Sequence, residues 1–284
     1  MIYVSSSCSK QKKIGAAIRE LAKHGFQDIE LSGGTDYYEG YEDDIFDLKE
    51  KYNLNFLVHN YFPPPKEDFV LNLASLDDVI FERSFAHLCK AIQLSCLLGA
   101  DKFGFHAGFY TDISVDEIGK AVSARQLCDT KQAEERFCKG FNLIKNESKG
   151  IEIYIENNVY SKTNFNIYGP RIPFMLTSLA DYRELQQHID FKLLLDVAHL
   201  YVSSRILDFD FKSSLDQMIM ETDYIHLSDN DSYHDQNAAF TIDSKLLYKI
   251  EKKYLKNKTI TLEIYTGLNS LRASFDRIAG IVDD

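Results

Sequence analysis

The segment IEIYIENN at residues 151–158 begins as a run of apolar side chains and ends in a carboxylate and two amides. Other segments follow the same design, with an apolar run that passes into polar residues: IYVSSS (2–7), FQDIELSG (26–33), NFLVHNYF (55–62), KFGFHAGF (102–109), FKLLLDVAHL (191–200), DYIHLSDND (223–231) and TITLEIYTG (259–267). Continuous apolar runs are typical of parallel strands that are buried on both faces. We interpret each segment as a strand of about five to six residues that leads into a polar loop.

Longer segments with apolar residues at helical spacing separate these strands. They are IGAAIRELAKHG (14–25), SFAHLCKAIQLSCLLGA (84–100), EERFCKGFNLIKNESKG (134–150), LTSLADYRELQQHI (176–189), FKSSLDQMIMETD (211–223), SKLLYKIEKKYLKN (244–257) and LNSLRASFDRIAGIV (268–282). Eight strands that alternate with helices predict a closed (β/α)8 barrel, and a length of 284 residues suits one domain over 1–284. An open doubly wound sheet is the alternative, but the chain lacks the glycine-rich phosphate loop that often accompanies it.

Composition narrows the classes of partner. The net charge of −11 and the absence of a dense Lys and Arg cluster argue against nucleic acid as the main partner. No apolar run is long enough for a membrane span, and the N-terminus lacks the order of a signal peptide. Five cysteines without a CxxC pair indicate reduced thiols and a cytoplasmic protein. A homo-oligomer is compatible with these features.

Metal-binding residue types recur where the predicted strands end. The residues at these ends are Glu30, His59, His106, Glu156, Asp196, His199, His226, Asp229 and Glu263. The carboxyl ends of barrel strands form the face on which barrel active sites lie. Several carboxylates buried together would repel one another unless a cation neutralised them. Mixed carboxylate and imidazole ligands predict a divalent ion such as Mn, Co, Mg or Zn.

These motifs resemble the xylose-isomerase-like barrels, which include sugar phosphate isomerases, ketose 3-epimerases and endonuclease IV-like nucleases. The resemblance rests on IELSGG, VHN, FHAGF, IENN, DVAH, IHLSDND and LEIY, and extends from residue 2 to about 282. It implies a metal site formed by Glu156, Asp196, His226 and Glu263, with His199 next to the metal and in contact with substrate. The implied reaction is sugar isomerisation or epimerisation, in which Glu156 and Glu263 remove and return the proton next to a carbonyl.

Two other reactions remain open on the same scaffold. A nuclease-like pattern would add His59 and His106 as metal ligands, and both are present. It also expects Asp-x-His and a glycine pair after the seventh strand, where this chain reads SYHDQNAAFTID. Asp235 matches the aspartate, Asn237 takes the place of the histidine, and His234 is the nearest substitute. An inosose-type dehydratase would use the same metal site, since its first step is also a proton abstraction.

Several further residues are expected around the substrate. Glu30 is either a ligand for a substrate hydroxyl or a carboxylate that holds a ligand histidine. Because the chain has no Trp, the apolar walls are expected to come from Phe62, Phe105, Phe109, Tyr160 and Tyr265. The loop FPPPKEDFVLNLAS (62–75) forms either a lid or wall over the barrel mouth or a stiff connection.

Overall fold

Eight parallel strands close into a barrel in sequence order, with β1 hydrogen-bonded to both β2 and β8. The computed structural model describes residues 1–283. The strands are β1 (Ile2–Ser5), β2 (Asp28–Leu31), β3 (Asn55–His59), β4 (Lys102–His106), β5 (Glu152–Glu156), β6 (Lys192–Asp196), β7 (Tyr224–Leu227) and β8 (Thr259–Leu262). Each strand lies within a segment expected from the sequence, so the predicted (β/α)8 barrel is confirmed.

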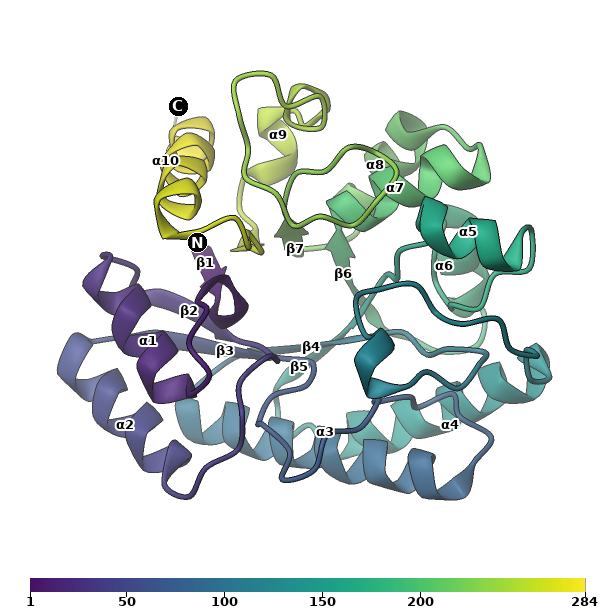
Figure 1. Ribbon diagram of the computed structural model, residues 1–284, viewed down its shortest axis with the longest axis horizontal. Helices are drawn as coiled ribbons and strands as arrows, with labels where there is room; N and C mark the ends of the chain where they lie inside the picture. The colour runs from purple at the N-terminus through teal and green to yellow at the C-terminus, as the bar shows by residue number, and fades with distance from the viewer. Residues whose placement is uncertain (284) are drawn as a thin grey trace.

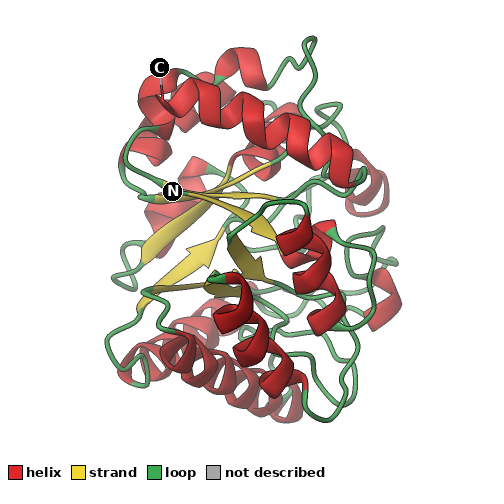
Figure 2. Cartoon of the chain, turned by 90° about the vertical axis from the view of Figure 1, so that its left-hand side faces the viewer, coloured by secondary structure: helices red, strands yellow, loops and turns green. Residues whose placement is uncertain are grey.

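Helices form a ring around the barrel (Figure 1), and the side view shows the strands enclosed between helical layers (Figure 2). The helices are α1 (Ile14–Lys23), α2 (Tyr41–Tyr52), α3 (Asp78–Leu98), α4 (Thr130–Asn146), α5 (Lys162–Tyr168), α6 (Leu179–Leu185), α7 (Val197–Leu207), α8 (Phe211–Met220), α9 (Lys252–Leu255) and α10 (Leu268–Asp283), with short 3-10 turns η1 (Ser6–Cys8), η2 (Val115–Glu117) and η3 (Leu247–Lys249). None of the helices over residues 1–283 is long and apolar enough to cross a membrane. All five cysteines are free thiols.

The structure differs from the sequence-based expectation at 244–257. One helix was expected there, but the segment forms η3 and the four-residue α9, separated by extended backbone at Ile250. Leu246, Ile250 and Tyr254 are buried as the helical spacing implied. Lysines at 249, 252, 253 and 256 would crowd like charges on one helix, and such pairs oppose a continuous helix.

The barrel interior is layered. Tyr3, Leu57, Tyr154, Leu194 and Tyr224 form a separate buried cluster that fills the barrel. Because side chains alternate across a strand, the residues two positions further along β3, β5, β6 and β7 also point inward. Those residues are His59, Glu156, Asp196 and His226. The polar layer therefore lies directly next to the apolar layer, toward the carboxyl ends of the strands.

Strand register brings the polar residues into neighbouring positions. His106 is paired with Glu156 across β4 and β5, and Asp196 is paired with His226 across β6 and β7. Gly104 on β4 leaves room between its neighbours, since a Cβ atom there would lie 2.7 Å from Leu194 Cδ2 and 3.2 Å from His59 Cδ2. The histidines can thus approach the barrel axis.

Candidate metal centre

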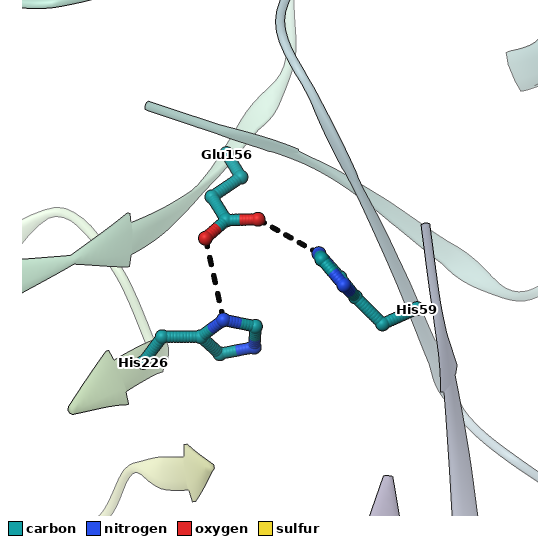
Figure 3. A group of neighbouring side chains, drawn as sticks. All are labelled: His59, Glu156 and His226. Atoms are coloured by element: carbon teal, nitrogen blue, oxygen red, sulfur yellow. Dashed lines mark hydrogen bonds and ion pairs between the residues drawn. The ribbon is translucent and has the colours of Figure 1, made fainter. Parts of the chain in front are cut away.

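Glu156 occupies the middle of the polar layer and is fully buried. Its Oε2 lies 2.7 Å from His59 Nε2 and 3.4 Å from His106 Nδ1. Its Oε1 lies 3.3 Å from His226 Nδ1, so the carboxylate is placed between histidines of different strands (Figure 3). Because each oxygen of Glu156 faces at least one imidazole, the carboxylate could bind a cation together with histidines from different strands.

A second carboxylate faces the same imidazole from β8. Glu263 directly follows β8, and its Oε2 lies 3.7 Å from His226 Nδ1. Potential ligand atoms of Asp196, His226 and Glu263 lie within 4.8 Å of one another, as do those of His59, Glu156 and His226. Two groups of potential ligands therefore meet at His226.

Several buried atoms of this centre lack a hydrogen-bond partner among residues 1–283. They are Glu156 Oε1, Asp196 Oδ2, His226 Nδ1 and His106 Nδ1. Unpaired buried polar atoms are rare in folded proteins because each loses its hydration without compensation. A divalent cation accepts lone pairs from carboxylates and imidazoles and would satisfy these atoms together. The donor set thus fits the metal that the sequence predicts.

Burial and neighbouring charges shift the pKa values of the carboxyl groups in this centre. Burial would raise the pKa of Glu156, but the charges of His106, His226 and His59 outweigh it and hold this pKa well below its usual value. Burial raises the pKa of Glu263 to about 7 and that of Asp196 to about 6, against opposing histidine charges. A bound cation would favour the ionised form of both carboxyls.

His199 reaches the centre because β6 passes directly into α7. Asp196 is the helix N-cap, and its Oδ1 accepts a hydrogen bond of 2.7 Å from the backbone N–H of His199. The His199 ring lies with Nδ1 2.8 Å from the Asn157 carbonyl oxygen, so Nδ1 is the donor. His199 Nε2 then faces Asp196 Oδ2 at 3.8 Å and Asp235 Oδ2 at 3.5 Å.

Asn157 is a functional candidate that the sequence reasoning did not single out. Its Nδ2 donates to the Asp196 carbonyl oxygen at 3.0 Å, and its Oδ1 accepts from the Asp196 N–H at 2.8 Å. Together with the contact to His199, these bonds connect β5 to the β6–α7 junction. The third letter of IENN was the available signal, since an amide next to a ligand carboxylate can hold the neighbouring strand.

The predicted residues that follow β7 lie at or near the cavity and not among the groups of convergent ligand atoms. Asp235 and His234 line the cavity above the centre, and His234 is exposed and paired with Asp231 at 2.8 Å. Asp229 lies outside the groups of convergent ligand atoms, and its Oδ1 accepts from the Asn230 N–H. Asn237, at the position where a histidine would continue the nuclease-like pattern, lines the cavity and has a left-handed φ of 45°.

A cavity of about 740 Å³ lies over the centre at the carboxyl ends of the strands. His59, His106, His199 and Glu263 lie at its base. The loop at 62–75 supplies part of the wall through Pro65, Asp68, Phe69 and Val70, so it forms a wall of the cavity. This volume is typical of a site for a small ligand.

Two of the five aromatic residues expected as walls, Phe109 and Tyr265, line the cavity, and the other three do not. Phe62, Phe105 and Tyr160 are fully buried and lie outside the cavity lining. Phe105 points away from the barrel axis and packs near Phe103 and Phe137, because it alternates with the inward-pointing His106. The aromatic residues that do line the cavity are Tyr61, Phe69, Phe109, Phe174 and Tyr265.

Comparison with known proteins agrees with this architecture. Residues 18–244 match the family model described as xylose isomerase-like TIM barrel. A search of curated proteins finds no match.

Among solved structures, a D-tagatose 3-epimerase-like protein superimposes with a TM-score of 0.73 at 16% identity, covering 99% of this chain and 97% of that one. D-psicose 3-epimerase with D-tagatose from Clostridium cellulolyticum gives 0.69 at 12% identity, covering 99% of each chain. Endonuclease IV from Thermus thermophilus gives 0.61 at 15% identity, covering 99% and 98%. At these identities the likeness establishes the fold.

Proposed function

Since this chain belongs to the family of xylose isomerase-like TIM barrels, we propose that it is a divalent-metal-dependent sugar isomerase or epimerase. The proposed substrate is a sugar or sugar phosphate with a C–H bond next to a carbonyl group. The reaction removes that proton and returns one. The placement of Glu156 and Glu263 is the observation that carries the proposal.

These two carboxylates approach the barrel axis from β5 and from the end of β8. His226 Nδ1 lies 3.3 Å from Glu156 Oε1 and 3.7 Å from Glu263 Oε2. Glu263 also lines the cavity, so it is accessible to a bound molecule. A substrate carbon held above His226 would have one carboxyl group on each side, as a two-base proton transfer requires.

Glu156, Asp196, His226 and Glu263 would hold the metal. When bound, the ion would supply Lewis-acid stabilisation of the negative charge that develops on the carbonyl oxygen. One carboxylate oxygen takes the proton as the C–H bond breaks, and the bonding electron pair moves toward the carbonyl group. The other carboxyl group returns a proton, to the same carbon from the opposite face in an epimerase or to the neighbouring carbon in an isomerase.

His199 is proposed to orient a substrate hydroxyl. Its ring is held by Asn157 through Nδ1, which leaves Nε2 to interact with a ligand at the base of the cavity. If a hydroxyl group left after the first proton transfer, the same residues would act as a dehydratase, so the product decides between these reactions.

A phosphodiesterase is the second candidate, favoured by His59 and His106 beside Glu156 Oε2. The cavity argues against it. Lys12 and Lys120 are its lysines, and it contains no arginine, whereas Asp36, Asp68, Glu117, Asp235 and Glu263 contribute carboxyl groups. A DNA backbone requires a surplus of positive charge, which this lining lacks. The charges of the cavity lining therefore favour a small sugar, and not a DNA duplex, as the substrate.

Two assays on one metal-loaded sample test the proposal. The protein is incubated with ketoses and inosose-like ketones in heavy water, and with a duplex that contains an abasic site. Proton abstraction predicts deuterium at the carbon next to the carbonyl, detected by NMR, and no strand cleavage. The Glu263→Gln variant should lose the exchange. Cleavage of the duplex without exchange into any ketone would overturn the proposal in favour of the phosphodiesterase.

A further inference from the structure

Glu30 lies beneath the candidate metal centre, where it contacts the side of His226 that faces away from Glu156. We propose that Glu30 is a positioning residue that keeps the proton of His226 on Nε2 and so directs the Nδ1 lone pair to the metal. This inference rests on the metal site of the proposed function. It assigns Glu30 one of the two roles that the sequence left open.

The Glu30 carboxylate faces His226 and not the cavity. Glu30 is 0% exposed and is not among the residues that line the cavity. The His226 ring separates its carboxylate from Glu156, since Nε2 faces Glu30 and Nδ1 faces Glu156. Potential ligand atoms of Glu30, His59 and Glu263 also lie within 4.8 Å of one another. Of His59 and His226, it is His226 whose ring nitrogen lies 3.2 Å from Glu30, so we assign Glu30 to act on the centre through His226.

The Glu30 carboxylate is surrounded by donors. Its Oε2 accepts hydrogen bonds from the Tyr224 hydroxyl and, at 2.8 Å, from Thr261 Oγ1. His226 Nε2 lies 3.2 Å from each carboxylate oxygen. An ionised carboxylate can only accept hydrogen bonds, so Nε2 must carry its proton and donate.

The consequence for His226 follows from the structure of imidazole. A histidine that binds a cation must be neutral, and a neutral ring has one N–H and one nitrogen with a free lone pair. With the proton kept on Nε2, the lone pair is on Nδ1, which is buried, unpaired and directed at Glu156 and Glu263. A carboxylate that receives the distal N–H of a ligand histidine fixes its orientation and makes it a better metal ligand.

Replacement of Glu30 by Gln preserves size but removes this control. A neutral amide can turn its NH2 group toward His226 Nε2, which would then have to accept and would leave the proton on Nδ1. A protonated Nδ1 cannot bind a cation. Even with the amide in its other orientation, the charge that strengthens the His226 hydrogen bond is gone.

The experiment uses the full chain labelled with 15N-histidine, with Zn²⁺ as the probe. Ring spectra of wild-type protein are recorded before and after Zn²⁺, and His226 is identified by comparison with His226→Gln. Zinc affinity is measured by competition with a chelator for wild type, Glu30→Gln and two controls. Thr261→Val removes one donor to Glu30 but keeps the Glu30 carboxylate that faces His226. Glu152→Gln neutralises a carboxylate at the opposite end of β5, where it pairs with Lys192.

We expect His226 Nε2 to be protonated in both wild-type spectra and Zn²⁺ to shift Nδ1. Zinc affinity should fall about 10–100-fold in Glu30→Gln and stay within about threefold of wild type in both controls. Zinc on Nε2, an Nε2 without a proton, or unchanged affinity in folded Glu30→Gln would overturn the inference. If Glu30→Gln does not fold, the wild-type spectra still show which nitrogen of His226 carries the proton and which one binds Zn²⁺. Zinc on Nδ1 in a protein that exchanges no ketone would uphold the inference and contradict the proposed function.

Discussion

His226 Nδ1 faces Glu156 Oε1 at 3.3 Å, yet within residues 1–283 neither atom has a hydrogen-bond partner of good geometry. Both atoms are buried, and Glu263 Oε2 also lies near His226 Nδ1, at 3.7 Å. An ion between them would compensate for the lost hydration of all three groups.

The first prediction concerns metal binding. The purified protein should bind a divalent ion whose ligand distances, measured by X-ray absorption, are about 2.0–2.3 Å. Asp196→Asn should weaken binding about tenfold or more, because it removes a charged ligand. Asp276→Asn is the matched control, since Asp276 is an exposed residue of α10 paired with Arg272. Equal affinity in Asp196→Asn and the control would contradict the proposed ligand set.

The second prediction concerns Glu263. Glu263→Gln preserves volume but removes charge and basicity, so turnover of a ketose substrate should fall at least ~100-fold. The control is Glu42→Gln on the exposed start of α2, where the carboxylate accepts a hydrogen bond from the Tyr41 hydroxyl. Steady-state kinetics with saturating metal separates loss of turnover from loss of metal. Near-normal turnover would show that Glu263 is neither a ligand nor a proton-transfer group.

The third prediction concerns the loop at 112–123 in the cavity wall. Glu117 holds it by accepting bonds from Ser114 N at 2.9 Å and Ser123 N at 2.8 Å, and by pairing with Arg125 at 2.8 Å. Glu117→Gln should accelerate tryptic cleavage within the loop about tenfold, since a hydrogen bond to a charged group contributes about 1.5–3 kcal/mol.

The thermal midpoint of Glu117→Gln should change little, because the effect is local. Asp116→Asn, on the neighbouring residue, should leave the cleavage rate at the wild-type value. An unchanged rate in Glu117→Gln would show that these bonds do not order the loop.

The fourth prediction concerns stability at low pH. Burial, together with Lys90 and Arg83, lowers the pKa of His87 to about 4, below its unfolded value of about 6.5. The unfolded chain therefore binds more protons between these values, and this contribution to stability is present above pH 6.5 and is lost as the pH falls toward 4. Between pH 7.5 and pH 5 the loss is about 2 kcal/mol.

His87→Leu should remove this loss. Urea unfolding at pH 7.5 and pH 5 measures the change for each protein, and the smaller fall should be in the variant. His188→Leu is the control, because that histidine lies on the surface beyond α6. Equal falls in wild type and His87→Leu would show that His87 does not titrate on unfolding.

The sequence was sufficient to predict the strands and their order, because each strand has a local apolar pattern and a polar end. It was less informative for helices whose boundaries depend on neighbours. The helix α7 begins at Val197, inside the segment 191–200 that was interpreted as a strand leading into a polar loop, because Asp196 caps the helix through the His199 N–H. The helix α2 was not predicted, since its exposed surface is mostly charged and only Ile45 and Leu48 are buried.

Local sequence also indicated which residue types gather at the barrel mouth, since parallel strands present their carboxyl ends on one face. Only the tertiary structure decided which of them meet. The alternation of β4 turned Phe105 toward the helices and His106 toward the centre, and the same alternation placed Tyr224 and Thr261 on the inner face with Glu30. Strand register then brought Glu156 between His59 and His226, which are far from it in sequence. Distances of this kind depend on how the barrel closes, and no local pattern encodes that closure.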